Sequence, residues 1–176
     1  MTLLEWGALG ELIGGIAIIG SLIYVGIQIR QNTRAVRGFT LQMNTDFWGT
    51  LCLRLAEPEM SQAYAAGMAG KPDIRPDHYI QFFFICRSMF LGLENQYYQF
   101  HQGTLDREIY FAYERSIQTQ LLASPGFRIC WQQTRVACSP NFVAYVDSMI
   151  ERTPEADPGA LLREWSTLAQ SRQSAA

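Results

Sequence analysis

The chain has 176 residues, of which 17% are charged, with sixteen acidic and fourteen basic side chains. This balance excludes the broad positive field that attracts nucleic-acid backbones, so we expect no nucleic-acid partner. Apolar residues make up 48% of the chain, and its charged fraction is below the roughly 25% usual in soluble domains. Part of the surface is therefore expected to be covered by membrane or by partner subunits.

The most apolar part of the chain, residues 12–29, predicts a transmembrane helix. These eighteen residues carry no formal charge, and as a helix they rise about 27 Å, close to the roughly 30 Å hydrocarbon core of a bilayer. A helix also satisfies its own backbone hydrogen bonds, as lipid requires. A cleaved signal peptide is the rival interpretation, but its basic residues would precede the apolar run rather than follow it. We expect residues 1–37 to form an uncleaved anchor with membrane lipids as partners.

The charges on either side of this helix predict its orientation. Acidic residues precede it without any Lys or Arg, whereas Arg30, Arg34 and Arg37 follow it. Positive charge stays on the cytoplasmic side, so the N-terminus is expected outside and the C-terminal domain in the cytoplasm. The three arginines share one helical face, where they are expected to meet anionic lipid headgroups.

Small or polar side chains form one stripe along the anchor. Gly10 and Gly14 have the spacing that lets two membrane helices approach closely. The stripe therefore predicts self-association or a partner helix, although glycine is also common in membrane helices for other reasons. Its members are Gly7, Gly10, Gly14, Ala17, Ser21 and Gln28.

Residues 38–170 predict one helical cytoplasmic domain, followed by a frayed tail at 171–176. Thr104 or Asp106 can cap one helix, and the pairs Ser124-Pro125 and Ser139-Pro140 are start signals of two others. No alternating strand pattern bounded by hairpin turns occurs. The expected fold class is all-α: a single N-terminal transmembrane helix followed by an antiparallel helical bundle domain.

Residues 79–93 are apolar on all sides, which predicts a helix buried among others. A second membrane span is the alternative interpretation. The segment is only about 22 Å long as a helix, and Arg87 lies at its middle. We therefore expect a core helix.

Arg87, Glu94 and the neighbouring Asn95 are the candidate buried polar residues of this core helix. They could form a polar functional site inside the domain. Alternatively, the two charged side chains could pair structurally with charged residues at 107–115. Structural ion pairs are common, and we expect the structural role.

No recognisable catalytic signature occurs in the chain. There is no nucleophile elbow, phosphate-binding glycine loop or Cys–His pattern, and the Glu-x-x-His repeat of di-metal bundles is absent. The four cysteines at 52, 86, 130 and 138 lack metal-ligand spacing and are expected to be small buried hydrophobes. We therefore expect that the protein is not an enzyme and that it binds no cofactor or metal. The sequence assigns no catalytic residue.

Aromatic side chains are concentrated between Phe82 and Tyr113. They could line a pocket for an apolar ligand such as a quinone or lipid. More often such a cluster is simply the core, because aromatics bury the most area.

Four stretches resemble one family: WGALGELIGGIAIIGSLIYVGIQIRQNTRAVR, LENQYYQFHQGTLD, LLASPGFRICWQQTR and SPNFVAYVD. They are similar to a widespread set of small, uncharacterised bacterial proteins with one N-terminal membrane helix and a helical cytoplasmic domain. The resemblance covers most of residues 5–150. It implies the same topology in the bacterial inner membrane, and it transfers no catalytic residue.

These observations favour a single-pass membrane-anchored helical scaffold or accessory subunit that self-associates or joins a membrane complex. A lipid- or quinone-binding membrane protein is the alternative, and an enzyme of unknown reaction comes third.

Overall fold

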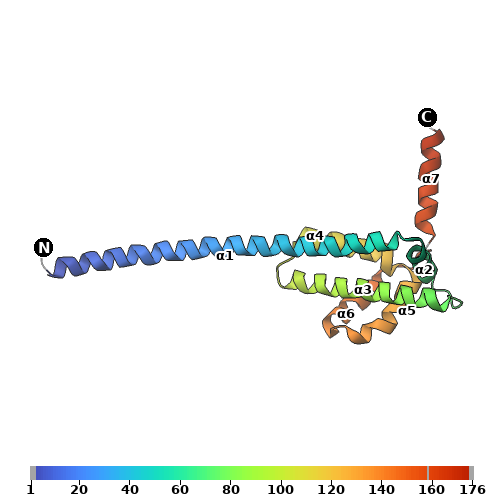
Figure 1. Ribbon diagram of the computed structural model, residues 1–176, viewed down its shortest axis with the longest axis horizontal. Coiled ribbons are helices and arrows are strands. Elements are labelled where there is room, and N and C mark those ends of the chain that lie inside the picture. Colours follow the sequence, from blue (N-terminus) through green and yellow to red (C-terminus); the bar gives the residue numbers. More distant parts are fainter. Residues whose placement is uncertain (1–2, 158, 175–176) are drawn as a thin grey trace.

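The computed structural model describes residues 3–157 and 159–174 and is helical along most of that length (Figure 1). Seven α-helices and no strand occur in this part of the chain, so the predicted all-α class is confirmed. The α-helices are α1 (Leu3–Leu55), α2 (Pro58–Met68), α3 (Pro76–His101), α4 (Arg107–Ile117), α5 (Pro125–Thr134), α6 (Pro140–Arg152) and α7 (Ala160–Ser174). A π-helical turn, η1 (Gln118–Leu122), extends α4, and a 3-10 turn, η2 (Arg135–Ala137), follows α5.

Helix α1 is unusually long, at 53 residues, which corresponds to about 80 Å. No proline interrupts it before Pro58, where α2 begins. Its first half extends away from the rest of the molecule, and its second half lies along the domain (Figure 1). The apolar first half of α1 and the first helix of the domain are therefore one continuous element.

The second half of α1 packs on α3, which runs back along it (Figure 1). Thr40 and Asn44 of α1 are buried, and the Asn44 side-chain amide donates a hydrogen bond to the Thr40 carbonyl at 2.9 Å. Gly92 of α3 lets the two helices approach, because a Cβ there would lie 2.4 Å from the Phe47 ring. Helices α1 and α3 are antiparallel (Figure 1). That the remaining helices complete an antiparallel bundle stays a prediction.

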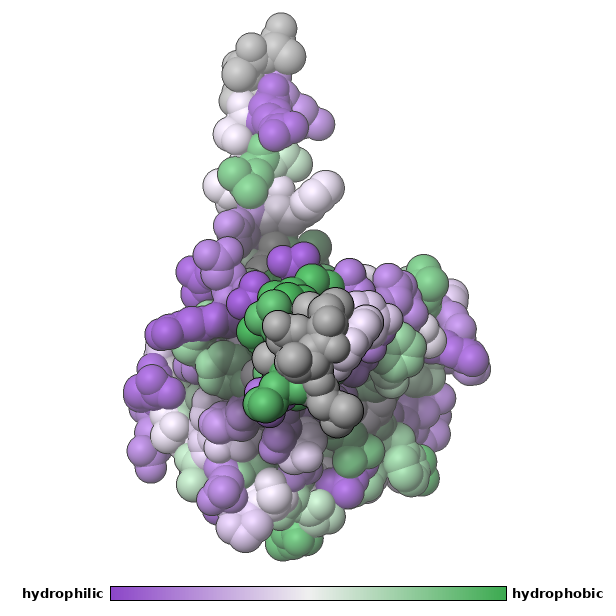
Figure 2. All heavy atoms as spheres, turned by 90° about the vertical axis from the view of Figure 1, so that its left-hand side faces the viewer, coloured by the Kyte–Doolittle hydropathy of each residue, from purple (hydrophilic) through white to green (hydrophobic). Residues whose placement is uncertain are grey.

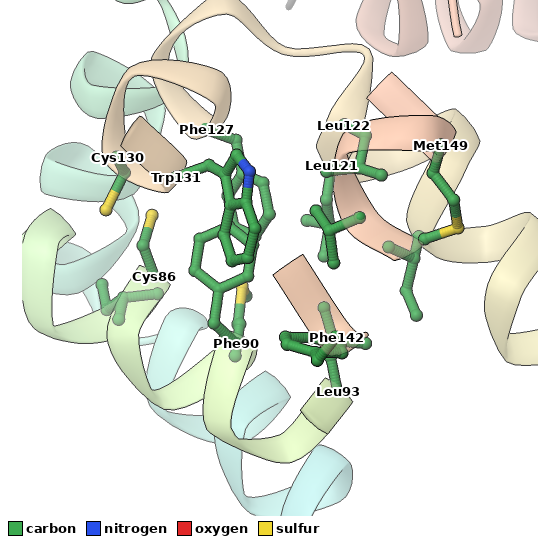
Figure 3. Close-up of a cluster of buried hydrophobic side chains, with 14 of the residues drawn as sticks. Cys86, Phe90, Leu93, Leu121, Leu122, Phe127, Cys130, Trp131, Phe142 and Met149 are labelled. Carbon is green, nitrogen blue, oxygen red and sulfur yellow. The ribbon is translucent and has the colours of Figure 1, made fainter. Parts of the chain in front are cut away.

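The hydrophobic core lies between α3 and the helices that follow it. Phe90 of α3 packs against Phe127 and Trp131 of α5, with ring centroids 4.6 and 4.8 Å apart, and Phe142 of α6 meets the edge of Trp131 (Figure 3). All four rings are fully buried. Of the aromatic side chains between Phe82 and Tyr113, those of Phe82, Phe90 and Tyr110 are buried, whereas those of Phe84, Tyr98 and Phe111 are exposed.

Local start signals determine where several helices begin. Helices α5 and α6 begin at Pro125 and Pro140, as the serine–proline pairs predict. The Ser124 hydroxyl accepts a hydrogen bond from the Phe127 amide at 3.3 Å, and Asp106 accepts one from the Glu108 amide at 2.9 Å. These side chains satisfy amides that the first turn of a helix leaves unpaired.

Helix α3 is not buried on all sides, which corrects the sequence-based expectation. One face of α3 supplies much of the core, whereas Ile80, Phe84 and Leu91 on another face are exposed. The described part of the chain therefore leaves the second face largely exposed. The prediction that α3 contributes to a core is nevertheless confirmed.

Helix α7 stands away from the domain (Figures 1 and 2). Its Trp165 is 72% exposed, and Leu162 and Leu168 are exposed as well. The predicted frayed tail is helical as far as Ser174, because no helix-breaking residue occurs there; residues 175 and 176 lie outside the described residues.

Candidate functional site

The most unusual surface of the molecule is the apolar first half of α1. An 18-residue window of this helix has a mean hydropathy of 2.1, and none of it is buried inside the structure. Figure 2 looks along α1 from its N-terminal end. Among the described residues, α1 is the one helix long and apolar enough to cross a membrane. Its complete exposure distinguishes it from the core helix of a soluble domain.

The predicted small-residue stripe lies on this exposed surface. No other atom of the described chain lies within 4 Å of a Cβ built on Gly7, Gly10 or Gly14. The polar members of the stripe bond within the helix: the Ser21 hydroxyl donates to the Ala17 carbonyl at 2.8 Å, and the Gln28 amide donates to the Tyr24 hydroxyl at 2.6 Å. The stripe is thus open to a partner helix.

The three arginines that follow the apolar segment are exposed, and one of them contacts the domain. The Arg37 Nε donates a hydrogen bond to the Gly103 carbonyl at 3.2 Å. Gly103 ends the α3 segment in a left-handed conformation, with φ of 71°. A guanidinium group at the C-terminal end of a helix is electrostatically favourable. Arg37 lies about 12 Å along α1 from Ile29, so the domain begins close to the apolar segment.

Glu94, one of the candidate buried polar residues, binds the beginning of α6. Its Oε1 accepts a hydrogen bond from the Ser139 backbone amide at 2.7 Å, while the Ser139 side chain makes no capping bond. A carboxylate is favourable at a helix N-terminus, where amide groups lack partners. The partner of Glu94 is therefore a helix end rather than the charged residues at 107–115.

Arg87 and Cys138 lie beside the Glu94 contact. Burial raises the pKa of the Cys138 thiol, the Glu94 charge adds to this increase, and the Arg87 charge opposes it. The Arg87 Nη1 is buried and has no hydrogen-bond partner among the described residues. Asn95, which was expected to be buried with them, lies on the exposed face that also carries Leu91 and Tyr98. One residue along a helix turns the side chain by about 100°, which takes Asn95 out of the cluster.

A second polar contact, which the sequence analysis missed, joins α5 to α6. The Trp131 indole donates a hydrogen bond to one Asp147 carboxylate oxygen at 2.8 Å, and Arg135 pairs with the other oxygen. The indole N–H of a buried tryptophan usually donates a hydrogen bond. The presence of Trp131 in a predicted helix was therefore a signal that a hydrogen-bond acceptor lies nearby. This contact stabilises the packing of the two helices.

Tyr110 of α4 is buried and Tyr145 of α6 is half-buried, and both are also poor candidates for catalysis. Burial is the main cause that raises the pKa of Tyr110 to about 12, and it also raises the pKa of Tyr145. Both phenols therefore stay protonated at neutral pH. The cavity that they line with Gln96 has a volume of about 10 Å³, which is no larger than one water molecule.

An apolar cavity lies between α3, α5 and the loop at 70–74. Its volume is about 290 Å³, and its walls include Phe82, Phe83, Ile129 and Cys130. At one side, the Tyr79 hydroxyl donates a hydrogen bond to the Gln133 side-chain oxygen at 3.3 Å. Small-molecule sites begin at about this size, so the cavity could hold a small apolar ligand.

No group of three or more His, Cys, Asp or Glu side chains in the described part of the chain could hold a metal ion. No protein-family model, curated protein or solved structure matches the chain. The resemblance to small bacterial membrane-anchored proteins therefore stays a prediction.

The role of Glu94 can be tested by stability measurements. We expect Glu94→Ala to lower the free energy of unfolding of the domain by about 1 kcal/mol, because the exposed α6 terminus loses a charged acceptor. Glu94→Gln, which keeps an acceptor oxygen, should lose less, and Asn95→Ala should change the value by less than about 0.5 kcal/mol. Chemical denaturation followed by circular dichroism measures all three. Equal stability of the Glu94→Ala variant and the wild type would contradict the structural role.

Proposed function

We propose that this protein is a single-pass membrane protein whose helical domain acts as a scaffold or accessory subunit by self-association. The observation that carries the proposal is the complete exposure of the apolar half of α1. Nothing in the described chain covers these side chains, and a bilayer would cover all of them at once. The absence of a recognised catalytic signature in the sequence is consistent with a role in assembly.

The expected membrane is the bacterial inner membrane, with the N-terminus outside and the domain in the cytoplasm. The three arginines after the apolar segment support this orientation, because basic residues remain on the cytoplasmic side. Arg30 and Arg34 are exposed next to the segment and are available to lipid phosphates. Arg37 contributes to the same face while it contacts the Gly103 carbonyl.

Self-association is supported by two exposed surfaces on different parts of the chain. One is the small-residue stripe of α1, which would pack against a second α1 within the bilayer. The other is a groove of about 450 Å³ between α1, α2 and α3, with Leu51, Ile80 and Phe84 among its walls. Phe84 is 65% exposed. Contiguous apolar surfaces of this kind usually mark sites of protein association, and anchoring in one membrane brings copies of the chain into the same plane.

Binding of an apolar ligand is a second candidate function, which the 290 Å³ cavity favours. The cavity lies near the start of α3, at the end of the domain opposite the Arg37–Gly103 contact. A ligand there would reach the domain from the cytoplasm or from a partner rather than directly from the bilayer. A constant added mass on the native protein would support this function.

The contact between anchors is tested by Gly14→Leu. A leucine side chain on the stripe would separate two packed helices. We therefore expect the dissociation constant of the oligomer to increase at least about tenfold, which corresponds to a loss of about 1.4 kcal/mol in the free energy of association. Native mass spectrometry of the protein in mild detergent measures the change. Gly26→Leu is the matched control, because Gly26 is equally open but lies on another side of the helix. Equal losses in the two variants, or none, would exclude the stripe as the contact.

The contact between domains is tested by Phe84→Arg. A charge in the groove would have to be buried on association, so we expect a lower oligomer mass by light scattering in the same detergent. Val136→Arg is the control, since Val136 is 87% exposed and lies outside the groove. A wild-type protein that is a monomer without any co-purifying protein would contradict self-association as a whole.

A further inference from the structure

Two cysteines far apart in the sequence lie against each other in the core. Cys86 belongs to α3 and Cys130 to α5, and their exposed fractions are 0% and 3%. Figure 3 shows the two sulfur atoms turned toward one another across the contact between these helices. Both are free thiols.

The two thiols are not equivalent. Burial raises the pKa of Cys86, and the neighbouring Cys130 side chain raises it further. The Cys86 side chain is in turn the main cause that lowers the pKa of Cys130, against the effect of burial. Of the two thiols, Cys130 is therefore the one whose thiolate form is favoured. Since the thiolate is the reactive form of cysteine, Cys130 is the expected nucleophile.

Cys130 is also the thiol that a small reagent can reach. It lines the 290 Å³ cavity beside α5, whereas Cys86 does not. The other walls include the exposed residues Lys71, Pro72 and Ile129, so the cavity lies at the surface. The cavity volume of about 290 Å³ is large enough to admit a molecule of the size of hydrogen peroxide next to Cys130.

We propose that Cys86 and Cys130 form a redox-active dithiol, which hydrogen peroxide converts to a disulfide that links α3 to α5. The Cys130 thiolate attacks one oxygen of the peroxide, the O–O bond breaks, and the departing hydroxide takes up a proton to form water. Cys130 is then a sulfenic acid. The Cys86 sulfur attacks the Cys130 sulfur, the S–O bond breaks, and a second water leaves with the Cys86 proton. In total, two thiols are oxidised to one disulfide while one peroxide is reduced to two waters.

The positions of the cysteines make the cross-link easy to identify. Trypsin cuts after Lys and Arg except before proline, and each cysteine then lies in its own peptide. The four peptides are residues 38–54 with Cys52, 55–87 with Cys86, 129–135 with Cys130 and 136–152 with Cys138. Because Lys71 and Arg75 precede prolines, the peptide that carries Cys86 stays intact.

The experiment treats the full-length protein in mild detergent with hydrogen peroxide and maps its peptides without a reductant. We expect peptide 55–87 linked to peptide 129–135 as the main product, and its loss after treatment with dithiothreitol. The Cys52→Ser, Cys138→Ser double variant should give the same product. A main product that joins any other pair of peptides, or no cross-linked peptide at all, would overturn the proposal.

The order of the two steps has its own test with dimedone, which traps sulfenic acids. Cys86→Ala removes the second thiol, so the dimedone adduct should accumulate on peptide 129–135. Cys130→Ala should leave no adduct on peptide 55–87. An adduct on Cys86 in the Cys130→Ala variant would overturn the assignment of Cys130 as the nucleophile. The mapping of the wild-type protein needs neither variant, so it remains decisive if a substitution disturbs folding.

Discussion

The structure depends on one constraint: no surface of residues 3–157 and 159–174 covers the apolar half of α1. Residues 12–29 carry no formal charge, and the large side chains among them are exposed. Removing each such side chain from water is worth about 2 kcal/mol, so the segment as a whole represents on the order of 20 kcal/mol. A term of this size exceeds the net stability of an ordinary domain. An apolar surrounding would therefore stabilise the segment, and its length is sufficient to cross a bilayer.

The same helix that meets this requirement also builds the domain. Helix α1 continues without a break to Leu55, and Asn44 and Phe47 on its second half pack toward α3. The hydrogen bond from Arg37 to the Gly103 carbonyl fixes the end of α3 to the part of α1 just beyond the apolar segment. Movement of the domain relative to the anchor is thus restricted by a continuous helix and by a second contact. A subunit that must present fixed surfaces beside a membrane would benefit from such a connection.

Local features of this fold were predictable from the sequence, whereas contacts between helices were not. The helix starts at Pro125 and Pro140 depend on residues next to each other in the chain, so the sequence was sufficient to predict them. The Glu94–Ser139 contact joins residues 45 positions apart, and it exists only because α3 and α6 pack together. The pairing of cysteines from α3 and α5 has the same origin. Hydropathy predicted that α3 is apolar. It could not predict which faces of α3 other helices cover, because apolar residues in a core and at an association surface have the same composition.

The location of the apolar segment can be measured directly with the exposed Cys52 as a reporter. Sealed inverted and right-side-out membrane vesicles from cells that make this chain are treated at neutral pH with a maleimide that cannot cross membranes, and the membranes are washed at high pH only after the reagent has been quenched. Our account predicts that the protein stays in the vesicle pellet and that peptide 38–54 is labelled in inverted vesicles alone. Recovery of the intact protein in the supernatant, or labelling of Cys52 in right-side-out vesicles, would contradict it.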